Sequence, residues 1–255
     1  MRRPIIDDPA DRTRKPERST GRRLRGALAH RLGRAIVGGE IKPGERLTGE
    51  IAHAAALDVS RSAYREAIQV LTAKGLVESR TKAGTIVQPR SRWNLLDPDM
   101  LAWAFSGEPD LAFIQHLFEL RSIVEPAAAR LAATRRTRDD LAALDAALAA
   151  MRRHTLATEA GQAADRDFHD ALLGATHNDA LVTLSASIGA AVSWTTRFKQ
   201  RAKALPRDPI PDHARVLAAI TAADPFAAET AMRDLVDLAF NDTRASLAGF
   251  SPPPA

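Results

Sequence analysis

The chain has 255 residues, enough for one large domain or two modest ones, and its charge is divided unevenly. Residues 1–92 hold 20 Lys and Arg against 10 Asp and Glu, whereas residues 93–255 hold 16 against 21, which is typical of a polyanion-binding module joined to one that does not touch the polyanion. The sequence has no cysteine, so disulfide bridges and thiolate chemistry are excluded.

The two ends of the chain and its longest uncharged run bear on where the protein works. Residues 1–23 are basic and lack the apolar core of a signal peptide, so we expect a disordered basic arm. We also expect a disordered tail over the proline-rich residues 249–255. The uncharged run Ala180–Thr196 is interrupted by Thr, Ser and Gly and is short for a membrane span. We therefore expect a cytoplasmic protein with no membrane contact.

The stretch from Leu47 to Val87 predicts a helix–turn–helix followed by a two-stranded wing. A short helix leads to a turn at residues 57–59, and the second helix opens with Ser60, whose hydroxyl can cap the first free backbone N–H groups. The wing hairpin would turn at residues 82–84. An ordinary helical hairpin with a solvated arginine face is the alternative, but several features coincide here.

The second helix of this stretch has the character of a recognition helix. Arg61 and Arg65 are four residues apart and share one face near its start, where side chains can reach base edges and phosphates in the major groove. The other face carries an apolar stripe that consists of Ala63, Ala67, Ile68 and Leu71. The sequence therefore predicts a DNA-binding unit.

Further residues around this stretch resemble the winged-helix domain of the GntR superfamily. The resemblance rests on Pro43-Gly44, Leu47, Glu50, Val59-Ser60-Arg61, Tyr64 to Ile68, Leu71, Lys74 to Val77 and Gly84. It implies a DNA-binding domain over residues 24–90 and double-stranded DNA as the partner. The DNA contacts that we expect from it come from Ser60, Arg61, Ser62, Arg65, Lys82 and Gly84. Three departures are His53 in place of an apolar residue, Asp58 in place of the turn glycine, and Ile51 where many relatives have a DNA-contacting arginine.

After the wing the pattern changes to an apolar linker and then to helices. Residues 91–109 include Trp93 and Trp103, and we expect this linker to pack against both domains. Helical spacing and capping residues predict helices near 110–133, 138–155, 162–175, 179–203, 211–222 and 225–248. The expected fold class is therefore mainly α, with an N-terminal winged helix-turn-helix followed by an all-α bundle over residues 110–248.

The helical half resembles the FCD ligand-sensing domain of the FadR branch of this superfamily. The matching residues are Glu119-Leu120-Arg121, Glu125-Pro126, Asp165 to His169, Asn178 and Asp212-His213. The linker around Arg92-Trp93-Asn94 resembles that of members that sense a galactonate-like sugar acid. The resemblance implies that the helical domain binds a small carboxylate effector.

A candidate metal site lies on the predicted helix 162–175. Asp165 and His169 are four residues apart, so both project from the same face and can supply two ligands to a divalent metal such as zinc. The resemblance adds His213 as a third ligand, whereas the position of a usual fourth ligand holds Leu235, which cannot coordinate. The three residues could hold a metal that binds the effector, bind the effector directly, or only satisfy one another.

Arg121 is a second candidate for the effector site. It lies in the apolar stripe of the helix that begins near residue 110, and a buried guanidinium is costly unless an anion pairs with it. Glu125, one turn further on, could be that partner. The interpretation that we favour is a bidentate clamp on the effector carboxylate.

These features together predict a ligand-responsive transcriptional regulator that is not an enzyme. We expect a homodimeric repressor that binds a palindromic operator and responds to a carboxylate or sugar acid. One alternative is a metal-dependent hydrolase, because one Asp and two His can also activate water, although no HExxH motif or Gly-rich phosphate loop is present. Another is a DNA-binding protein that no effector regulates.

Overall fold

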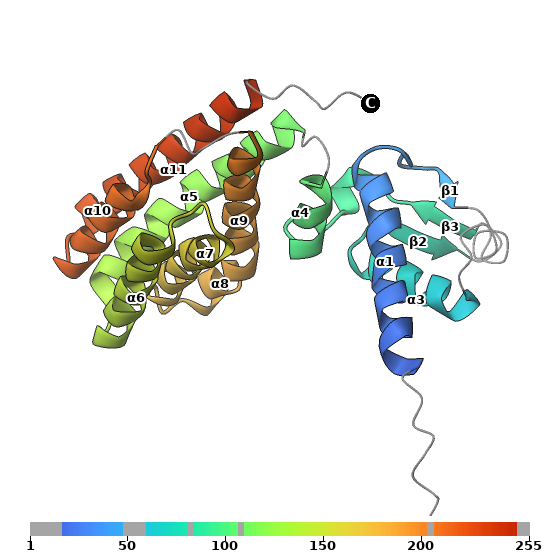
Figure 1. Ribbon diagram of the computed structural model, residues 1–255, viewed down its shortest axis with the longest axis horizontal. Helices are drawn as coiled ribbons and strands as arrows, with labels where there is room; N and C mark the ends of the chain where they lie inside the picture. The colour runs from blue at the N-terminus through green and yellow to red at the C-terminus, as the bar shows by residue number, and fades with distance from the viewer. Residues whose placement is uncertain (1–16, 48–59, 81–83, 107–109, 203–206, 249–255) are drawn as a thin grey trace, which may run out of the picture. The chain divides into compact units, whose positions relative to one another are not determined.

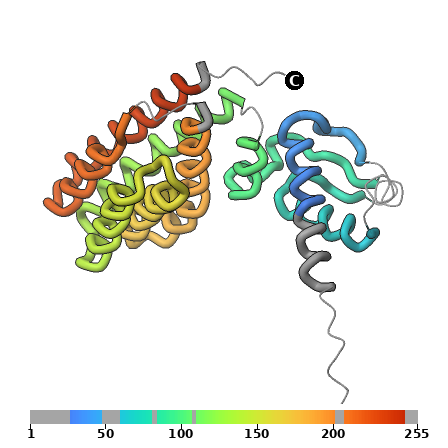
Figure 2. Tube along the Cα trace, in the orientation of Figure 1, coloured from blue at the N-terminus to red at the C-terminus, as the bar shows by residue number. Residues whose placement is uncertain are grey.

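The chain divides into two compact units, Met1–Asn94 and Leu95–Ala255, which are described separately (Figures 1 and 2). The computed structural model describes residues 17–47, 60–80, 84–106, 110–202 and 207–248, without the side chains of residues 17–26, 201–202 and 247–248. The first helix and turn of the predicted helix–turn–helix, Lys82, residues 1–16 of the predicted arm and the predicted tail lie outside the described residues.

The first unit combines two described helices with a small antiparallel sheet. Its elements are α1 (Glu17–Val37), β1 (Arg46–Leu47), α3 (Arg61–Ala73), β2 (Val77–Arg80) and β3 (Gly84–Val87). The strand order is β1-β3-β2, so β3 pairs with both neighbours and the sheet has three strands rather than the two predicted. The third strand forms because the N–H of Val87 donates to Glu45 O and that of Gly44 to Val87 O, which brings Leu47 into the core.

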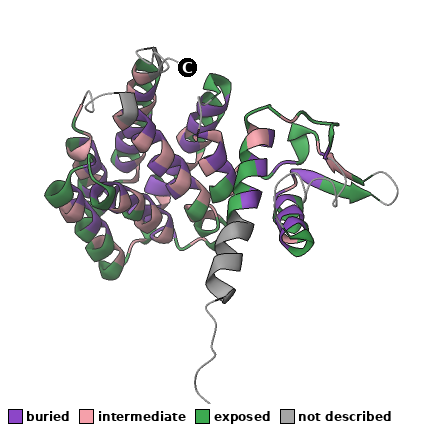
Figure 3. Cartoon of the chain, turned by 45° about the vertical axis from the view of Figure 1, so that its right-hand side comes forward, coloured by how far each residue is buried: buried purple, intermediate pink, exposed green. Residues whose placement is uncertain are grey.

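The two helices of this unit pack through their apolar faces. Ser60 caps α3 as predicted, with its Oγ accepting the N–H of Ala63 at 3.2 Å. The predicted stripe of α3 is confirmed as its buried face, with Tyr64 in addition, and it lies against α1 (Figure 3). Helix α1 begins at Glu17, so residues 17–23 are not a disordered arm. No proline follows Pro16 until Pro43, and Arg, Leu and Ala favour the helix there.

The residues predicted as a linker are divided between the two units. Trp93 is buried in the first unit, where its ring N–H donates to Gln88 O at 2.8 Å. Gly75 ends α3 with a φ of +74°, and any Cβ there would collide with the backbone of Arg92 in the short 3-10 helix Arg90–Arg92. Helix α4 (Pro98–Ala104), which carries Trp103, belongs to the second unit.

The second unit is a bundle of helices, which confirms the predicted fold class. After α4 come α5 (Leu111–Arg135), α6 (Arg138–His154), α7 (Glu159–Gly174), α8 (Asp179–Val182), α9 (Ser185–Ala202), α10 (Ile210–Thr221) and α11 (Pro225–Ala248). Helix α11 packs on α5 and α10, and α7 packs on α6 and α9. No described helix is long and apolar enough to cross a membrane.

The single helix predicted over residues 179–203 is wrong, because a turn at Thr183 and Leu184 separates α8 from α9. The Thr183 hydroxyl donates to Ala180 O at 2.7 Å. A side-chain hydroxyl that satisfies a backbone carbonyl competes with the regular helical ladder, so the helix ends there. Asn178 caps the start of α8 by accepting the N–H of Ala180.

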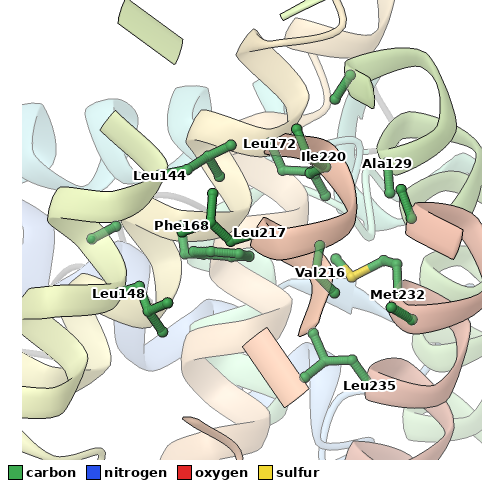
Figure 4. Packing of buried hydrophobic residues seen from close by; sticks show 14 of the residues in the cluster. Ala129, Leu144, Leu148, Phe168, Leu172, Val216, Leu217, Ile220, Met232 and Leu235 are labelled. Carbon is green, nitrogen blue, oxygen red and sulfur yellow. The ribbon is translucent and has the colours of Figure 1, made fainter. Parts of the chain in front are cut away.

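Besides a small group made of Ala128, Leu173, Ile188 and Val192, two larger groups of buried side chains hold the bundle together. The larger joins α5, α6, α7, α10 and α11, and Figure 4 shows Phe168 of α7 among Leu144, Leu148 and Leu217. The smaller joins α4, α5, α9 and α11 through Leu101, Phe105, Phe118, Phe198 and Val236, among others. Helix α7 thus contributes to the larger group and also packs on α9.

Candidate effector site and DNA-binding face

Helices α7 and α10 bring Asp165, His169 and His213 together. Their ligand atoms all lie within 4.8 Å of one another, and the three residues are buried. The Nε2 atom of His213 is 3.1 Å from Asp165 Oδ1, and that of His169 is 3.9 Å from the same oxygen. The ring of His213 is also held by an edge-on contact with Phe168, whose centroid is 5.0 Å away.

The Nδ1 atoms of the two imidazoles face groups outside this cluster. The Nδ1 of His213 lies 2.9 Å from Pro209 O, and because a carbonyl only accepts, that nitrogen carries the proton. The Nδ1 of His169 lies 2.6 Å from Glu125 Oε2, within ion-pair distance but without hydrogen-bond alignment. Each ring therefore presents its Nε2 to Asp165, as second partners orient histidines in metal sites.

The cluster fits a divalent cation. His213 Nε2 is fully buried and has no hydrogen-bond partner among the described residues, which costs about 1–3 kcal/mol unless a ligand satisfies it. Burial raises the pKa of the Asp165 carboxyl, but His213, His169 and Lys199 outweigh it and hold that pKa at about 2. Asp165 is therefore anionic, and one carboxylate with two imidazoles is a donor set that zinc accepts.

Arg121 is paired with Glu125. Its Nε donates to Glu125 Oε1 at 2.6 Å, and its guanidinium carbon lies 5.0 Å from the centroid of the Phe118 ring. Burial raises the pKa of Glu125, but Arg121 and His169 lower it to about 2. The structure shows this ion pair, and the clamp of Arg121 on an effector carboxylate stays a prediction. The carboxylate of Glu125 thus links Arg121 to His169.

A small cavity lies against the cluster. Its walls include Arg121, Asp165, His169, His213 and Leu235, with further residues from α9, α11 and the segment just before α10. The cavity measures about 20 Å³, room for one water molecule or one ion. A larger ligand can bind only if some wall residues move. Leu235, at the position of the missing fourth ligand, is buried and lines the same cavity.

Sequence reasoning missed the contribution of α9. Val192, Thr195, Thr196 and Lys199 line the cavity, and Thr196 Oγ1 donates to Asp165 Oδ2 at 3.4 Å. Their spacing of three and four residues places them on one helix face, and Lys199 in an otherwise uncharged face was the signal that could have revealed the site. Arg207, also a wall residue, pairs with Asp212 and Asp242.

The predicted DNA contacts that lie among the described residues are found at the start of α3 and at the start of β3. Arg61, Ser62 and Arg65 are exposed on the first two turns of α3. Ser60 Oγ lies 3.0 Å from Ser62 Oγ besides capping the helix. Gly84 is exposed and has a φ of +78°, a conformation that favours glycine in the wing. Exposed arginines at the positive end of a helix suit phosphate binding.

Comparison with known families matches both units. The model of bacterial regulatory proteins of the gntR family matches residues 24–87, and that of the FCD domain matches residues 116–238.

Curated relatives cover much of the chain. The galactonate operon transcriptional repressor of Escherichia coli (strain K12) is 40% identical over 157 residues, which are 62% of this chain and 69% of the relative. LutR of Bacillus subtilis (strain 168) is 33% identical over 202 residues, 77% of this chain and 90% of the relative. The Uxu operon transcriptional regulator of E. coli (strain K12) is 32% identical over 203 residues, 74% and 75% of the two chains.

Solved structures show the same fold at low sequence identity. Lar, which controls the expression of the Listeria monocytogenes agr system, superposes with a TM-score of 0.62 at 21% identity, over 87% of this chain and 97% of the other. McbR/YncC of E. coli gives a TM-score of 0.51 at 18% identity, over 88% and 97%. The families and curated relatives described above are transcriptional regulators rather than enzymes.

Proposed function

Because the chain belongs to the gntR family of bacterial regulatory proteins and carries an FCD domain, we propose that it is a transcriptional repressor released from DNA by a small carboxylate. The observation that carries the proposal is the cavity in the FCD domain, where Asp165, His169 and His213 converge and the Nε2 of His213 has no hydrogen-bond partner among the described residues. A regulator needs a site of this kind to sense a metabolite.

The DNA-binding half of the proposal rests on α3. Arg61 and Arg65 are exposed on its first two turns, while Tyr64, Ala67 and Leu71 hold the opposite face in the core. A single recognition helix reads a short half-site, so we infer a homodimer that binds a palindromic operator in the cytoplasm. The Gly84 wing would contact the neighbouring backbone, with Lys82 on phosphates.

The effector class that we infer is a sugar acid. The galactonate operon repressor is the model for this inference, because it is 40% identical to the chain over 157 residues. A hydroxycarboxylate carries oxygen ligands that suit a cation held by Asp165, His169 and His213, which when bound would supply positive charge and open coordination positions. Without a cation, the same side chains would hydrogen-bond the effector directly.

Helix α9 connects the cavity with α4, the first helix of the second unit. One face of α9 lines the cavity, and another packs on α4, where Trp194 stacks on Phe105 with ring centroids 6.3 Å apart. Because the cavity holds only a water or an ion, a sugar acid must displace wall residues such as those of α9. Movement of α9 would move α4, the first α-helix after the DNA-binding domain.

Operator binding in the presence of sugar acids tests the proposal. DNA selected by the purified full-length protein would be titrated in gel-shift assays against galactonate, gluconate and glucuronate. We expect at least one acid to weaken binding roughly 5- to 150-fold, the range of a coupling of about 1–3 kcal/mol. DNA binding that no carboxylate alters would contradict the proposal and favour a DNA-binding protein without an effector.

A further inference from the structure

Lys199 is a buried cation without a partner. Its side chain lines the cavity, the residue is only 7% exposed, and its ammonium makes no hydrogen bond or ion pair with any residue in the described part of the chain. The other two cations of the cavity differ, since Arg121 is paired with Glu125 and Arg207 with Asp212 and Asp242.

The carboxylates near Lys199 are committed to other groups. Asp165 Oδ1 faces the two imidazoles and its Oδ2 accepts from Thr196, while Asp242 is held by Arg207 Nη2 at 3.3 Å. Burial lowers the pKa of Lys199 to about 8, although Asp165 acts to raise it. Lys199 is therefore still mostly protonated at neutral pH, and the attraction of Asp165 and Asp242 offsets its burial only in part. A buried ammonium beside carboxylates that are already engaged calls for an anion.

The position of Lys199 on α9 suits a ligand that also reaches the cluster. Thr196 bonds to Asp165, and Lys199 lies three residues further along the same face, about 4.5 Å along the helix axis. A hydroxycarboxylate of a few carbon atoms can span such a distance, with its carboxylate at one end and a hydroxyl at the other. A lone inorganic anion would leave one end of the site unused.

We propose that Lys199 binds the carboxylate of the effector, while the hydroxyl oxygens of the effector face Asp165, His169 and His213. This assignment rests on the proposed function, and it transfers the carboxylate clamp from Arg121 to Lys199. Arg121 keeps a structural task, because its Nε holds the Glu125 carboxylate that contacts His169. Lys199 thereby decides that the ligand is an anion.

Substitution of Lys199 tests the assignment with the full-length protein. Lys199→Met removes the charge and keeps the apolar stem, and Lys199→Arg keeps the charge. Arg138→Met, at the exposed start of α6, is the matched control for net charge. The probes are lactate, glycerate, gluconate and galactonate, with glycerol, sorbitol and galactitol as uncharged counterparts. Binding is measured by calorimetry and thermal shift, with added Zn²⁺ and in EDTA.

We expect at least one carboxylate, and none of the alcohols, to bind the wild type and Arg138→Met. Lys199→Met should lose roughly 10- to 100-fold in affinity for it, as a charge-assisted contact implies, and Lys199→Arg should keep part of it. Lys199→Met should remain folded and retain as much zinc as the wild type, because Lys199 is not a ligand of the cluster. Equal carboxylate binding by Lys199→Met and the wild type would overturn the assignment.

Two further results would also overturn the assignment: an alcohol that binds as well as its acid, or a wild type that binds none of the acids. Operator binding separates the assignment from the proposed function. A carboxylate that binds through Lys199 but leaves DNA affinity unchanged supports the assignment and contradicts the proposed function. A carboxylate that releases DNA equally from the wild type and Lys199→Met supports the proposed function and contradicts the assignment.

Discussion

At the scale of single residues, the cavity depends on side chains that are each oriented by a second group. Pro209 O fixes the ring of His213, Glu125 lies against His169, and Thr196 bonds Asp165. The pairing of Asp165 with His169 could be predicted from their spacing. His213 lies 44 residues beyond His169, so only family resemblance predicted it. Contacts such as Glu125 with His169, or Lys199 with the cavity, depend on helix packing that no local pattern encodes.

Metal retention should change in opposite directions at two cavity positions. His213→Gln removes one imidazole ligand and should weaken zinc retention. Leu235→His should tighten it, because Leu235 lines the same cavity and the histidine would add a fourth ligand. Elemental analysis after competition with a chelator measures both, with His116→Gln, on the exposed face of α5, as control. A protein without metal and with a full effector response in EDTA would identify the three residues as direct effector contacts.

Operator affinity should depend on Arg65. Arg65→Ala should lose about 1–3 kcal/mol of specific operator binding and leave the melting temperature unchanged, because the side chain is exposed. Fluorescence anisotropy at matched salt measures the loss, and Arg138→Ala removes the same charge from the other domain. Lys82→Ala should instead lower the salt dependence without changing sequence preference. An Arg65→Ala variant that binds its operator as tightly as the wild type would refute this contact.

At the scale of elements, capping residues predicted several helix starts, whereas the internal break between α8 and α9 was not predicted. Ser60, Thr137 and Asn178 all cap helices, because one side-chain oxygen next to the first turn determines the result locally. The break between α8 and α9 was missed, since Thr183 fits a helix interior as well as its end. The third strand of the sheet was missed because two-residue β1 has no pattern of its own.

The start of α6 allows a test of one such cap. Thr137 Oγ1 accepts the N–H of Asp140, and Asp140 accepts the N–H of Thr137 in return. Thr137→Ala should lower the free energy of unfolding by about 1 kcal/mol, measured in urea, and the exposed Thr230→Ala on α11 should lower it much less. Equal effects of the two substitutions would show that the capping box contributes no stability.

The same capping box should give part of the stability a pH dependence. Burial raises the pKa of Asp140, but hydrogen bonds from Thr137 and the contact with His177 lower it below the usual value. A carboxyl with a lowered folded-state pKa stabilises the protein above its unfolded-state pKa, and that contribution is lost as the pH falls through the folded-state value. The gap in stability between the wild type and Thr137→Ala should therefore narrow in acid.

At the scale of the whole molecule, regulation requires that ligand binding in the cavity move an element that leads to the DNA-binding domain. Helix α9 contacts the ligand cluster through Thr196 and helix α4 through Trp194. The two-domain order and the mainly α fold could be predicted from the charge division and the motifs. The cavity's small volume could not, because it depends on how tightly α9 packs on α7.

Substitution at the contact of α9 with α4 should separate binding from regulation. Trp194→Leu removes the stacking on Phe105 but no cavity residue. We expect effector affinity and operator affinity, each measured alone, to stay within roughly threefold of the wild type. The factor by which bound effector weakens operator binding should fall. Phe226→Leu, an exposed aromatic on α11, is the control. A Trp194→Leu protein with undiminished coupling would exclude this route.

The most direct test of the central claim is the affinity of the wild type for its carboxylate with and without operator DNA. If the ligand in the cavity releases DNA, thermodynamic linkage requires DNA to weaken ligand binding by the same factor. Calorimetric titration of the free protein and of the saturated complex measures both affinities. We predict roughly 5- to 150-fold weaker carboxylate binding to the complex, equal to the loss of operator affinity. Equal carboxylate affinity in the two states would contradict the account.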